Sequence, residues 1–385
     1  MRRRYRVALA VASFAAAVVV VLGLTRLAPA TQGPLSGLLD RAAAAVDELE
    51  HRMRVRLSGA GRGRSLAWFE PYRASVDRLR RPEDVLLGAY DNRLPGSAEG
   101  IVELERALDT TFPLVQIYTA WGDEPEHQFP LRALTMIWTM GSVPVVTWEP
   151  WLSVFDSRRA SLPPPGGRDR GGLGAIARGD YDFYVDEWAR EAARFGRPFF
   201  LRFAHEMNDP YRYPWGPQNN SKEEFVAAWQ HVAQRFRRAG AHNVLWVWSP
   251  HVAYEYWELW YPGDQDVDWI ATTTLNYGPV AQWSRWWTFE DIFETKYPRL
   301  EAFGKPVMIA ELGSLAVGGD RSEWYKDALT DLPARLPAVK AVLFFNVAHD
   351  QTVTMQKVDW TLDADPHVAA AVRQAIAPWA PGRAR

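Results

Sequence analysis

The chain contains no cysteine among its 385 residues. That absence excludes disulfide bonds, thiolate metal sites and a cysteine nucleophile. An excess of charge of one sign is also missing, since 44 basic residues stand against 46 acidic ones and leave a formal net charge of −2. Domains that bind nucleic acid usually carry a broad basic footprint, so we expect no nucleic-acid partner.

Aromatic residues, by contrast, are abundant: they make up 13% of the chain and include 19 tryptophans. Flat apolar rings with a polar edge suit the weakly polar faces of sugars. Burial is nevertheless the commoner use of aromatic rings, so composition by itself favours a tryptophan-rich core. Only the positions of these residues can decide between the two uses.

The N-terminus has the pattern of an export signal. Four arginines within the first six residues precede an uncharged run over 7–24, and small residues follow at 28–30. The run of 18 residues is just long enough to span a bilayer, so an uncleaved membrane anchor competes with cleavage after Ala30. The basic flank of such an anchor stays cytoplasmic. We therefore expect residues 1–30 to place the rest of the chain outside the cytoplasm, either anchored to the membrane or secreted.

The next segment, 31–80, has the features of a spacer. Apolar residues recur at helical spacing over 35–57 with charged residues between them, which predicts a helix near the membrane. The Gly-Arg stretch over 59–64 ends this helix and is typical of a flexible link. We place the main domain at 81–380 and expect it to act as a monomer.

From residue 81 onward the chain repeats one theme: a short apolar run, a loop, and then a longer helical segment. Eight such runs are present, at 85–90, 114–119, 143–148, 199–204, 244–248, 269–275, 307–310 and 342–345. Most are continuous, as in parallel strands that are buried on both faces. They predict an α/β fold, a (β/α)8 TIM barrel. A doubly wound open sheet is the alternative, but the chain lacks the Gly-rich phosphate turn of that fold.

The clearest helix signal lies between the fourth and fifth runs. Ser221 is followed three residues later by Glu224, which is the capping box that opens a helix. Apolar residues then recur on one face, and Gly240 is placed to end the helix.

Polar side chains follow two of the predicted strands, at the end where a barrel places its chemistry. Arg202 lies in the fourth run, His205, Glu206 and Asn208 follow it, and Glu311 follows the seventh. Glycosidic cleavage needs one protonated carboxyl and one ionised carboxylate, and two glutamates supply both. Taken singly, each glutamate is more often an ion-pair or solvated residue. Because strands four and seven lie across the barrel mouth, however, the two can converge over one bound sugar.

These motifs resemble glycoside hydrolase family 26, a clan A family best known for β-mannanases. Residues 205–208, followed by Trp215, are similar to the acid/base motif of the family, and 307–311 are similar to its nucleophile strand. The resemblance covers residues 81–377. One departure is the stretch 209–215, where the family usually continues with glycine and a tight aromatic run.

The resemblance implies a retaining glycoside hydrolase in which Glu311 is the nucleophile and Glu206 first donates and then accepts a proton. We expect burial and the charge of Glu311 to raise the pKa of Glu206. Arg202 and Tyr277 are expected to hydrogen-bond Glu311, although Arg202 has the alternative role of a barrel-interior ion pair and His205 that of a core histidine. The expected substrate-binding residues are His205, Asn208, Arg202, Trp148, Tyr211, Trp215, Tyr277 and Trp283.

Aromatic residues concentrate in or near the loops at the catalytic face. We treat about half of them as sugar platforms and the rest as packing. They are Trp121, Trp148, Trp151, Tyr211, Trp215, Trp257, Trp283, Trp286 and Trp287. The loop 161–174 is rich in proline and glycine and is expected to form a mobile cleft wall. No metal site stands out among the eight histidines, and the expected reaction needs no cofactor.

The expected substrate is a β-linked polysaccharide, with endo-β-1,4-mannan cleavage as the first hypothesis. A β-1,3/1,4-glucanase and a hydrolase that trims an exopolysaccharide during export are the alternatives among enzymes. The alternative from another class is a non-catalytic, membrane-tethered, glycan-binding barrel, against which both glutamates argue. Loop shape decides which sugar fits, and a single sequence does not specify it.

Overall fold

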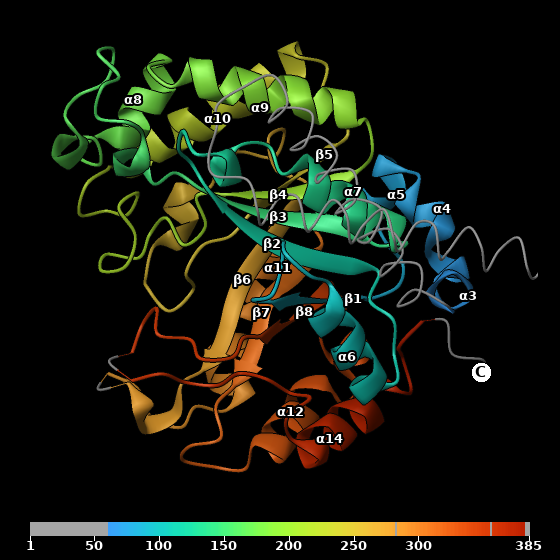
Figure 1. Cartoon of the computed structure of the whole chain (residues 1–385). Coiled ribbons are helices and arrows are strands. Elements are labelled where there is room, and N and C mark those ends of the chain that lie inside the picture. The colour runs from blue at the N-terminus through green and yellow to red at the C-terminus, as the bar shows by residue number, and fades with distance from the viewer. Residues whose placement is uncertain (1–60, 282, 355, 382–385) are drawn as a thin grey trace, which may run out of the picture. The chain divides into compact units, whose positions relative to one another are not determined.

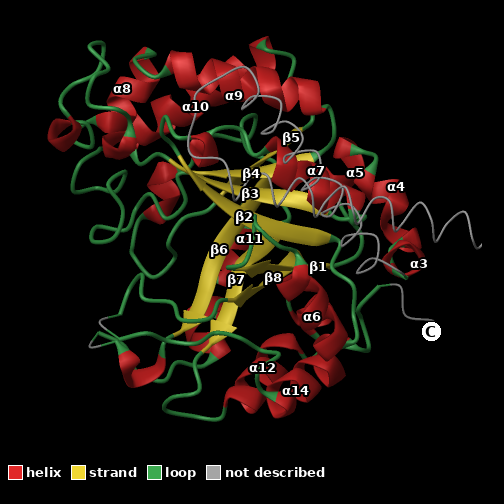
Figure 2. Ribbon diagram, in the orientation of Figure 1, coloured by secondary structure: helices red, strands yellow, loops and turns green. Residues whose placement is uncertain are grey.

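Eight parallel strands close into a barrel with helices around it (Figures 1 and 2). The structure is a computed structural model that describes residues 61–281, 283–354 and 356–381. The strands are β1 (Leu86–Asp91), β2 (Leu114–Ala120), β3 (Val143–Glu149), β4 (Phe199–Phe203), β5 (Val244–Trp248), β6 (Trp269–Asn276), β7 (Val307–Ser314) and β8 (Val339–Asn346). All eight predicted strands are present. Because β1 pairs with β8 along its whole length, the sheet is closed and the open-sheet alternative is wrong.

Helices lie between successive strands, as the (β/α)8 prediction requires, except between β5 and β6, where the described chain has only the short turn η5 (Trp257–Trp260). Those between β1 and the C-terminus are α6 (Glu99–Leu108), α7 (Leu131–Thr139), α8 (Gly172–Arg178), α9 (Asp182–Phe195), α10 (Lys222–Arg238), α11 (Tyr297–Glu301), α12 (Arg321–Leu329), α13 (Leu332–Arg335) and α14 (Pro366–Ile376). Short helical turns lie in the loops: η2 (Pro125–His127), η3 (Leu152–Val154), η4 (Pro165–Gly167), η5 (Trp257–Trp260), η6 (Gly278–Val280) and η7 (Glu290–Glu294).

Helix α10 begins as the sequence predicts. The side chain of Ser221 accepts from the backbone N–H of Glu224, and the carboxylate of Glu224 accepts from the backbone N–H of Ser221. This capping box satisfies two amide donors that the first helical turn would leave unpaired. The helix then buries an apolar stripe against the barrel and ends at Arg238, two residues before Gly240.

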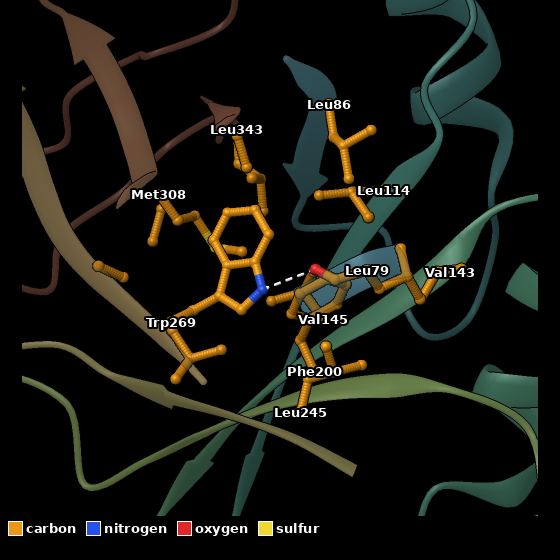
Figure 3. Packing of buried hydrophobic residues seen from close by; sticks show 14 of the residues in the cluster. Leu79, Leu86, Leu114, Val143, Val145, Phe200, Leu245, Trp269, Met308 and Leu343 are labelled. Carbon is orange, nitrogen blue, oxygen red and sulfur yellow. Dashed lines mark hydrogen bonds between the residues drawn. The ribbon is translucent and has the colours of Figure 1, made fainter. Parts of the chain in front are cut away.

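The segment just before the first strand belongs to the barrel unit. It forms α3 (Arg62–Ser65), η1 (Ala67–Phe69), α4 (Glu70–Arg73) and α5 (Val76–Arg80). Leu66, Phe69 and Leu79 are buried in one cluster with residues from the starts of the strands. Figure 3 shows the indole of Trp269 in this cluster, where its Nε1 donates to the carbonyl of Leu79 over 2.9 Å.

The predicted domain boundary at 81 and the flexible link are therefore wrong for residues 61–80. Arg62 is buried, forms an ion pair with Glu105, and donates to the hydroxyl of Ser142 over 2.7 Å. Sequence patterning missed this because the short helices are amphipathic only over single turns, and they gain their stability from the barrel end that they cover.

Two predictions lie outside the described residues, namely the signal or anchor over 1–30 and the spacer helix over 35–57. Within the described part of the chain, no helix combines the length and apolar character needed to cross a membrane.

Candidate active site

A cavity of about 600 Å³ lies at the carboxyl ends of the strands. Its wall is built from the ends of β1, β2, β3, β7 and β8 and from the loops that follow β3, β4 and β8. The lining includes Tyr118, Glu149, Trp151, His205, Arg212 and Glu311. Because this end of a TIM barrel carries its chemistry, the cavity is the candidate active site.

Glu311 lies within β7 and lines the cavity. Arg202 Nη2 donates to Glu311 Oε1 over 2.6 Å, and the hydroxyl of Tyr118 donates to the same oxygen over 2.7 Å. The pairing registers of β7 with β6 and with β8 both shift around Ala310. Such a bulge re-aims side chains within a strand. It lets β7 continue to Ser314, past the end that the sequence predicts.

Arg202 is held inside the barrel by a second contact. Its side chain is fully buried, and its Nε donates to Thr147 Oγ1 over 2.9 Å. Burial disfavours the cation, but the charge of Glu311 and the neighbouring Tyr118 raise the pKa of Arg202 above its ordinary value. The expected Arg202–Glu311 hydrogen bond is confirmed, whereas the second donor is Tyr118 rather than Tyr277.

Glu206 follows β4 on a strained turn. Its φ is +52°, and Ala204 two residues earlier has a φ of +44°, a region that residues other than glycine rarely adopt. The backbone N–H of Glu206 donates to the carbonyl of Ser249 over 2.7 Å, which ties the turn to β5. The carboxyl is 1% exposed; Arg212 Nη1 lies 3.5 Å from its Oε2, and its Oε1 has no hydrogen-bond partner among the described residues.

The electrostatic surroundings of Glu206 differ from the expectation. Burial raises its pKa, but the charges of His251 and Arg212 outweigh that effect and lower the pKa of Glu206 to about 2. The predicted raised pKa is therefore wrong for this conformation of the site. No motif places Arg212 beside Glu206, because the loop after residue 208 departs from the family pattern that the motif around Glu206 resembles.

His205 lines the cavity as a neutral ring. Its Nε2 lies 3.0 Å from the hydroxyl of Tyr213, and its Nδ1 lies 3.9 Å from Glu149 Oε1. Burial and the charge of Arg202 lower the pKa of His205 well below its usual value. The ring is thus fixed in the cavity wall next to Glu206, and its contact with a sugar stays a prediction.

Trp148 does not face the cavity. Its ring is fully buried and lies 4.5 Å from the ring centroids of Trp121 and Trp188, the latter on α9. Successive side chains on a strand alternate between faces, so Thr147 and Glu149 point into the barrel while Trp148 points toward the helices. The prediction of Trp148 as a sugar contact is wrong, and the neighbouring Glu149 lines the cavity instead.

The other predicted aromatic residues divide between packing and exposure. Trp121 and Trp257 are fully buried. Trp215 is 2% exposed; its Nε1 donates to the carbonyl of His205 over 2.7 Å and its ring stacks on Tyr213, so it supports the wall from behind. Trp151 lines the cavity.

The remaining predicted contacts lie outside the cavity wall. The amide of Asn208 donates to the carbonyl of His251 and accepts from its N–H, so both of its groups tie the loops after β4 and β5 together. Tyr277 is buried against Trp360 and Trp283. Tyr211 and Trp283 are 83% and 65% exposed and remain candidate platforms beyond the cavity.

The predicted mobile wall is anchored and lies away from the cavity lining. Within the loop 161–174, Arg168 is buried and donates to the carbonyls of Pro163, Phe155 and Asp156. None of the described residues of this loop lines the cavity. Three guanidinium contacts to backbone oxygens brace the proline-rich turn.

The cavity residues that were missed at the sequence level include Tyr118, Glu149 and Arg212. The first two lie at strand ends and share the inward-facing parity of their strands, a two-residue alternation that could have found them. Arg212 lies on an irregular loop whose course no periodic signal specifies.

Among the described residues, one group has the composition of a cation site. Ligand atoms of Glu206, Asp209 and His251 lie within 4.8 Å of one another. The guanidinium of Arg212 already lies beside Glu206, and the backbone N–H of Arg212 donates to Asp209 Oδ1 over 3.2 Å. A second cation at this place would be repelled by the first.

The fold and this geometry define the class: a (β/α)8 barrel with one carboxyl after β4 and one on β7, the pair of groups that glycosidic cleavage requires. The sequence model of glycosyl hydrolase family 26 matches residues 180–302, which include Glu206 and its motif. The chain is therefore similar to glycosyl hydrolase family 26 over these residues, and the expected resemblance is confirmed.

The relatives of the chain carry several substrate names. Endoglucanase H of Acetivibrio thermocellus is 30% identical over 301 residues, covering 75% of this chain and 30% of that protein. Beta-1,3-xylanase TXYA of a Vibrio species is 33% identical over 123 residues, covering 29% of this chain and 25% of that protein. The chain thus spans less than a third of the length of these curated relatives.

A solved structure supports the fold. The GH26 beta-mannanase BoMan26A of Bacteroides ovatus superposes with a TM-score of 0.56 at 15% identity, covering 78% of this chain and 90% of that one. At this identity the likeness concerns the barrel and its connections, and specificity has to be argued from the site of this chain.

Proposed function

We propose that the chain is a retaining glycoside hydrolase that cleaves a β-linked polysaccharide and is mannanase-like. Glu311 is the nucleophile and Glu206 is the acid/base. The observation that carries this proposal is the pair of buried carboxyls at the ends of β4 and β7, one of them fixed by two donors beside a cavity of sugar size. Buried carboxylates are costly, and such groups cluster at catalytic sites.

Two displacements account for the chemistry. In the first, an oxygen of Glu311 bonds to the anomeric carbon while Glu206 transfers its proton to the leaving glycosidic oxygen. In the second, Glu206 takes a proton from water, and the water oxygen displaces Glu311 from the sugar. Because Arg202 and Tyr118 both donate to Oε1 of Glu311, we assign the attack to Oε2.

The first step requires a proton on Glu206, whereas its cationic neighbours favour the ionised form. A sugar bound against Glu206 excludes water and separates the carboxyl from Arg212, and both changes raise the pKa of Glu206. The acid form is thus produced in the substrate complex. Arg212 Nη1 is already 3.5 Å from Oε2, a long contact that a sugar oxygen can replace.

The chemical test follows the anomer that is released first, by proton NMR, with the barrel unit from residue 61. Retention supports Glu311 as nucleophile, and an inverted product rejects that role. Glu206→Gln and Glu311→Gln should each lower turnover by several orders of magnitude. If a glycan binds with measurable affinity but no glycan on a broad panel is cleaved, the non-catalytic glycan-binding barrel becomes the better account.

The substrate is tested by incubation with mannan, glucomannan, mixed-linkage β-glucan and β-1,3- and β-1,4-xylan, with products sized. The relatives are named for glucan, xylan and mannan, so the panel covers each class. Cleavage of mannan to short oligosaccharides supports an endo-mannanase. Cleavage of mixed-linkage glucan alone supports the β-1,3/1,4-glucanase alternative, and inactivity on all five directs attention to an exopolysaccharide.

Export is part of the proposal. The basic and apolar run over 1–30 supports an extracytoplasmic enzyme that is either anchored or cleaved after Ala30. Cell fractionation with an antibody to the barrel tests this: membrane association that is lost on deletion of 1–30 indicates an anchor. Recovery of the chain from the cytoplasm would reject export, and sedimentation analysis tests the expected monomer.

A further inference from the structure

Glu149 is a third carboxyl in the cavity, and the proposed mechanism does not use it. It is the last residue of β3, it points into the barrel, and it is 17% exposed at the cavity wall. Its Oε2 accepts from the indole Nε1 of Trp151 over 3.2 Å. The side chain is therefore oriented from one side, with a neighbouring aromatic ring that also lines the cavity.

The charge of Glu149 has no strong ionic partner among the described residues. The nearest basic atom recorded is His205 Nδ1 at 3.9 Å, beyond hydrogen-bond distance. That nitrogen is itself buried without a hydrogen bond, and the lowered pKa of His205 keeps the ring neutral. A buried carboxyl without a paired cation lowers stability, so its presence at a binding cavity points to a ligand that satisfies it.

We propose that Glu149 is a substrate-binding residue that accepts hydrogen bonds from adjacent hydroxyl groups of the neutral pyranose unit held in this cavity. The inference rests on the proposed function, because it takes a glycan as the ligand. An ionised carboxylate is an acceptor only and offers several lone pairs, so it matches two neighbouring hydroxyl donors. The ring of Trp151 beside it offers an apolar face to the C–H groups of the same sugar.

The surroundings make this binding pH-dependent. Burial raises the pKa of Glu149 to about 7. The titratable or charged groups that face it are Tyr90 from β1, Tyr118 from β2, Arg202, His205, Arg212 and Tyr213 from β4 and its loop, and Glu311 from β7; His349 lines the same cavity. Because hydroxyl donors favour the carboxylate over the acid, affinity should rise as the pH increases through 7, and binding should release protons.

The test is calorimetric binding to the full chain carrying Glu206→Gln, a background that slows cleavage and keeps the charge of Glu311. The probes are mannotetraose, cellotetraose and a mixed-linkage glucan tetraose at pH 6 and pH 8. Adding Glu149→Gln should weaken the binding of the preferred probe at pH 8 by roughly tenfold to a hundredfold. Glu149→Gln should also remove the difference in affinity between pH 6 and pH 8. It should abolish the release of protons on binding, which is measured by comparing binding enthalpies in buffers of different ionisation enthalpy.

The variant tests binding rather than folding, because a glutamine oxygen can still accept from Trp151. Glu126→Gln is the matched control, since it makes the same change at an exposed carboxyl on the loop after β2 that does not line the cavity. If the parent binds a probe and Glu149→Gln binds it equally well at both pH values, the proposal is overturned. If the parent binds none of the three probes or the polysaccharides of the activity panel, the proposed function fails instead.

Discussion

Arg202 and Glu311 form a buried ion pair across the barrel, from β4 to β7, with 2.6 Å between Nη2 and Oε1. Neither side chain is more than 7% exposed. The pair therefore fixes the position of one carboxylate oxygen, and the other oxygen is the one to which we assign the proposed attack. Each partner has a second contact that orients it: Arg202 Nε donates to Thr147 Oγ1, and the hydroxyl of Tyr118 donates to Glu311 Oε1.

Arg202→Met should remove both orientation and charge compensation from Glu311. We expect a loss of turnover on the order of 10² to 10³, together with a loss of about 3 to 5 kcal/mol in unfolding free energy from the unpaired buried carboxylate. Denaturant unfolding and single-turnover kinetics measure the two effects. The double variant with Glu311→Gln should regain part of the stability and none of the activity; unchanged turnover in the single variant would reject the role of Arg202.

Arg212→Met should raise the pKa of Glu206, because it removes one of the cations that lower that pKa to about 2. The carboxyl resonance of Glu206, labelled with ¹³C and assigned with Glu206→Gln, should then titrate at higher pH than in the parent. The alkaline limb of kcat/KM, where the acid form is lost, should move in the same direction. Arg212→Lys keeps the charge and serves as control; an unchanged titration in Arg212→Met would contradict the assignment.

Trp283 and Trp148 give a matched pair of predictions for aromatic residues. Trp283 is 65% exposed, so Trp283→Ala should weaken binding of long glycans if the ring is a platform, with little change in stability. Trp148 is fully buried, so Trp148→Ala should cost about 3 to 5 kcal/mol of unfolding free energy. Thermal denaturation and glycan affinity electrophoresis separate the two. A stable Trp148→Ala with weakened binding would restore the sequence-level prediction.

Much of the barrel could be predicted because each buried strand is a continuous apolar run, and the strand ends locate the chemistry. Glu206 and Glu311 followed from that rule together with their motifs. The alternation of side chains along a strand decides which residues face the cavity. At β3 the conspicuous aromatic residue is Trp148, but Glu149 is the one that faces the cavity.

What could not be predicted depends on contacts between segments that are distant in sequence. The bulge at Ala310 arises from the pairing of β7 with both neighbours, and no local pattern signals it. Arg212 reaches Glu206 through an irregular loop fixed by Asp209, whose Oδ1 accepts from two backbone N–H groups. The direction of the Glu206 pKa shift follows from that loop together with His251 on the loop after β5, which is why the expected direction was wrong.

The segment before β1 decides where the folding unit begins. A chain that starts at 81 loses Leu66, Phe69 and Leu79 from the barrel end and leaves Glu105 without Arg62. Exposing three apolar side chains at about 1.5 to 3 kcal/mol each and breaking a buried pair at about 3 to 5 kcal/mol together match much of the stability of a typical domain. Expression from residue 61 should therefore give a cooperative thermal transition, and expression from residue 81 an aggregated or molten product. Equal melting temperatures for the two would show that these helices are dispensable.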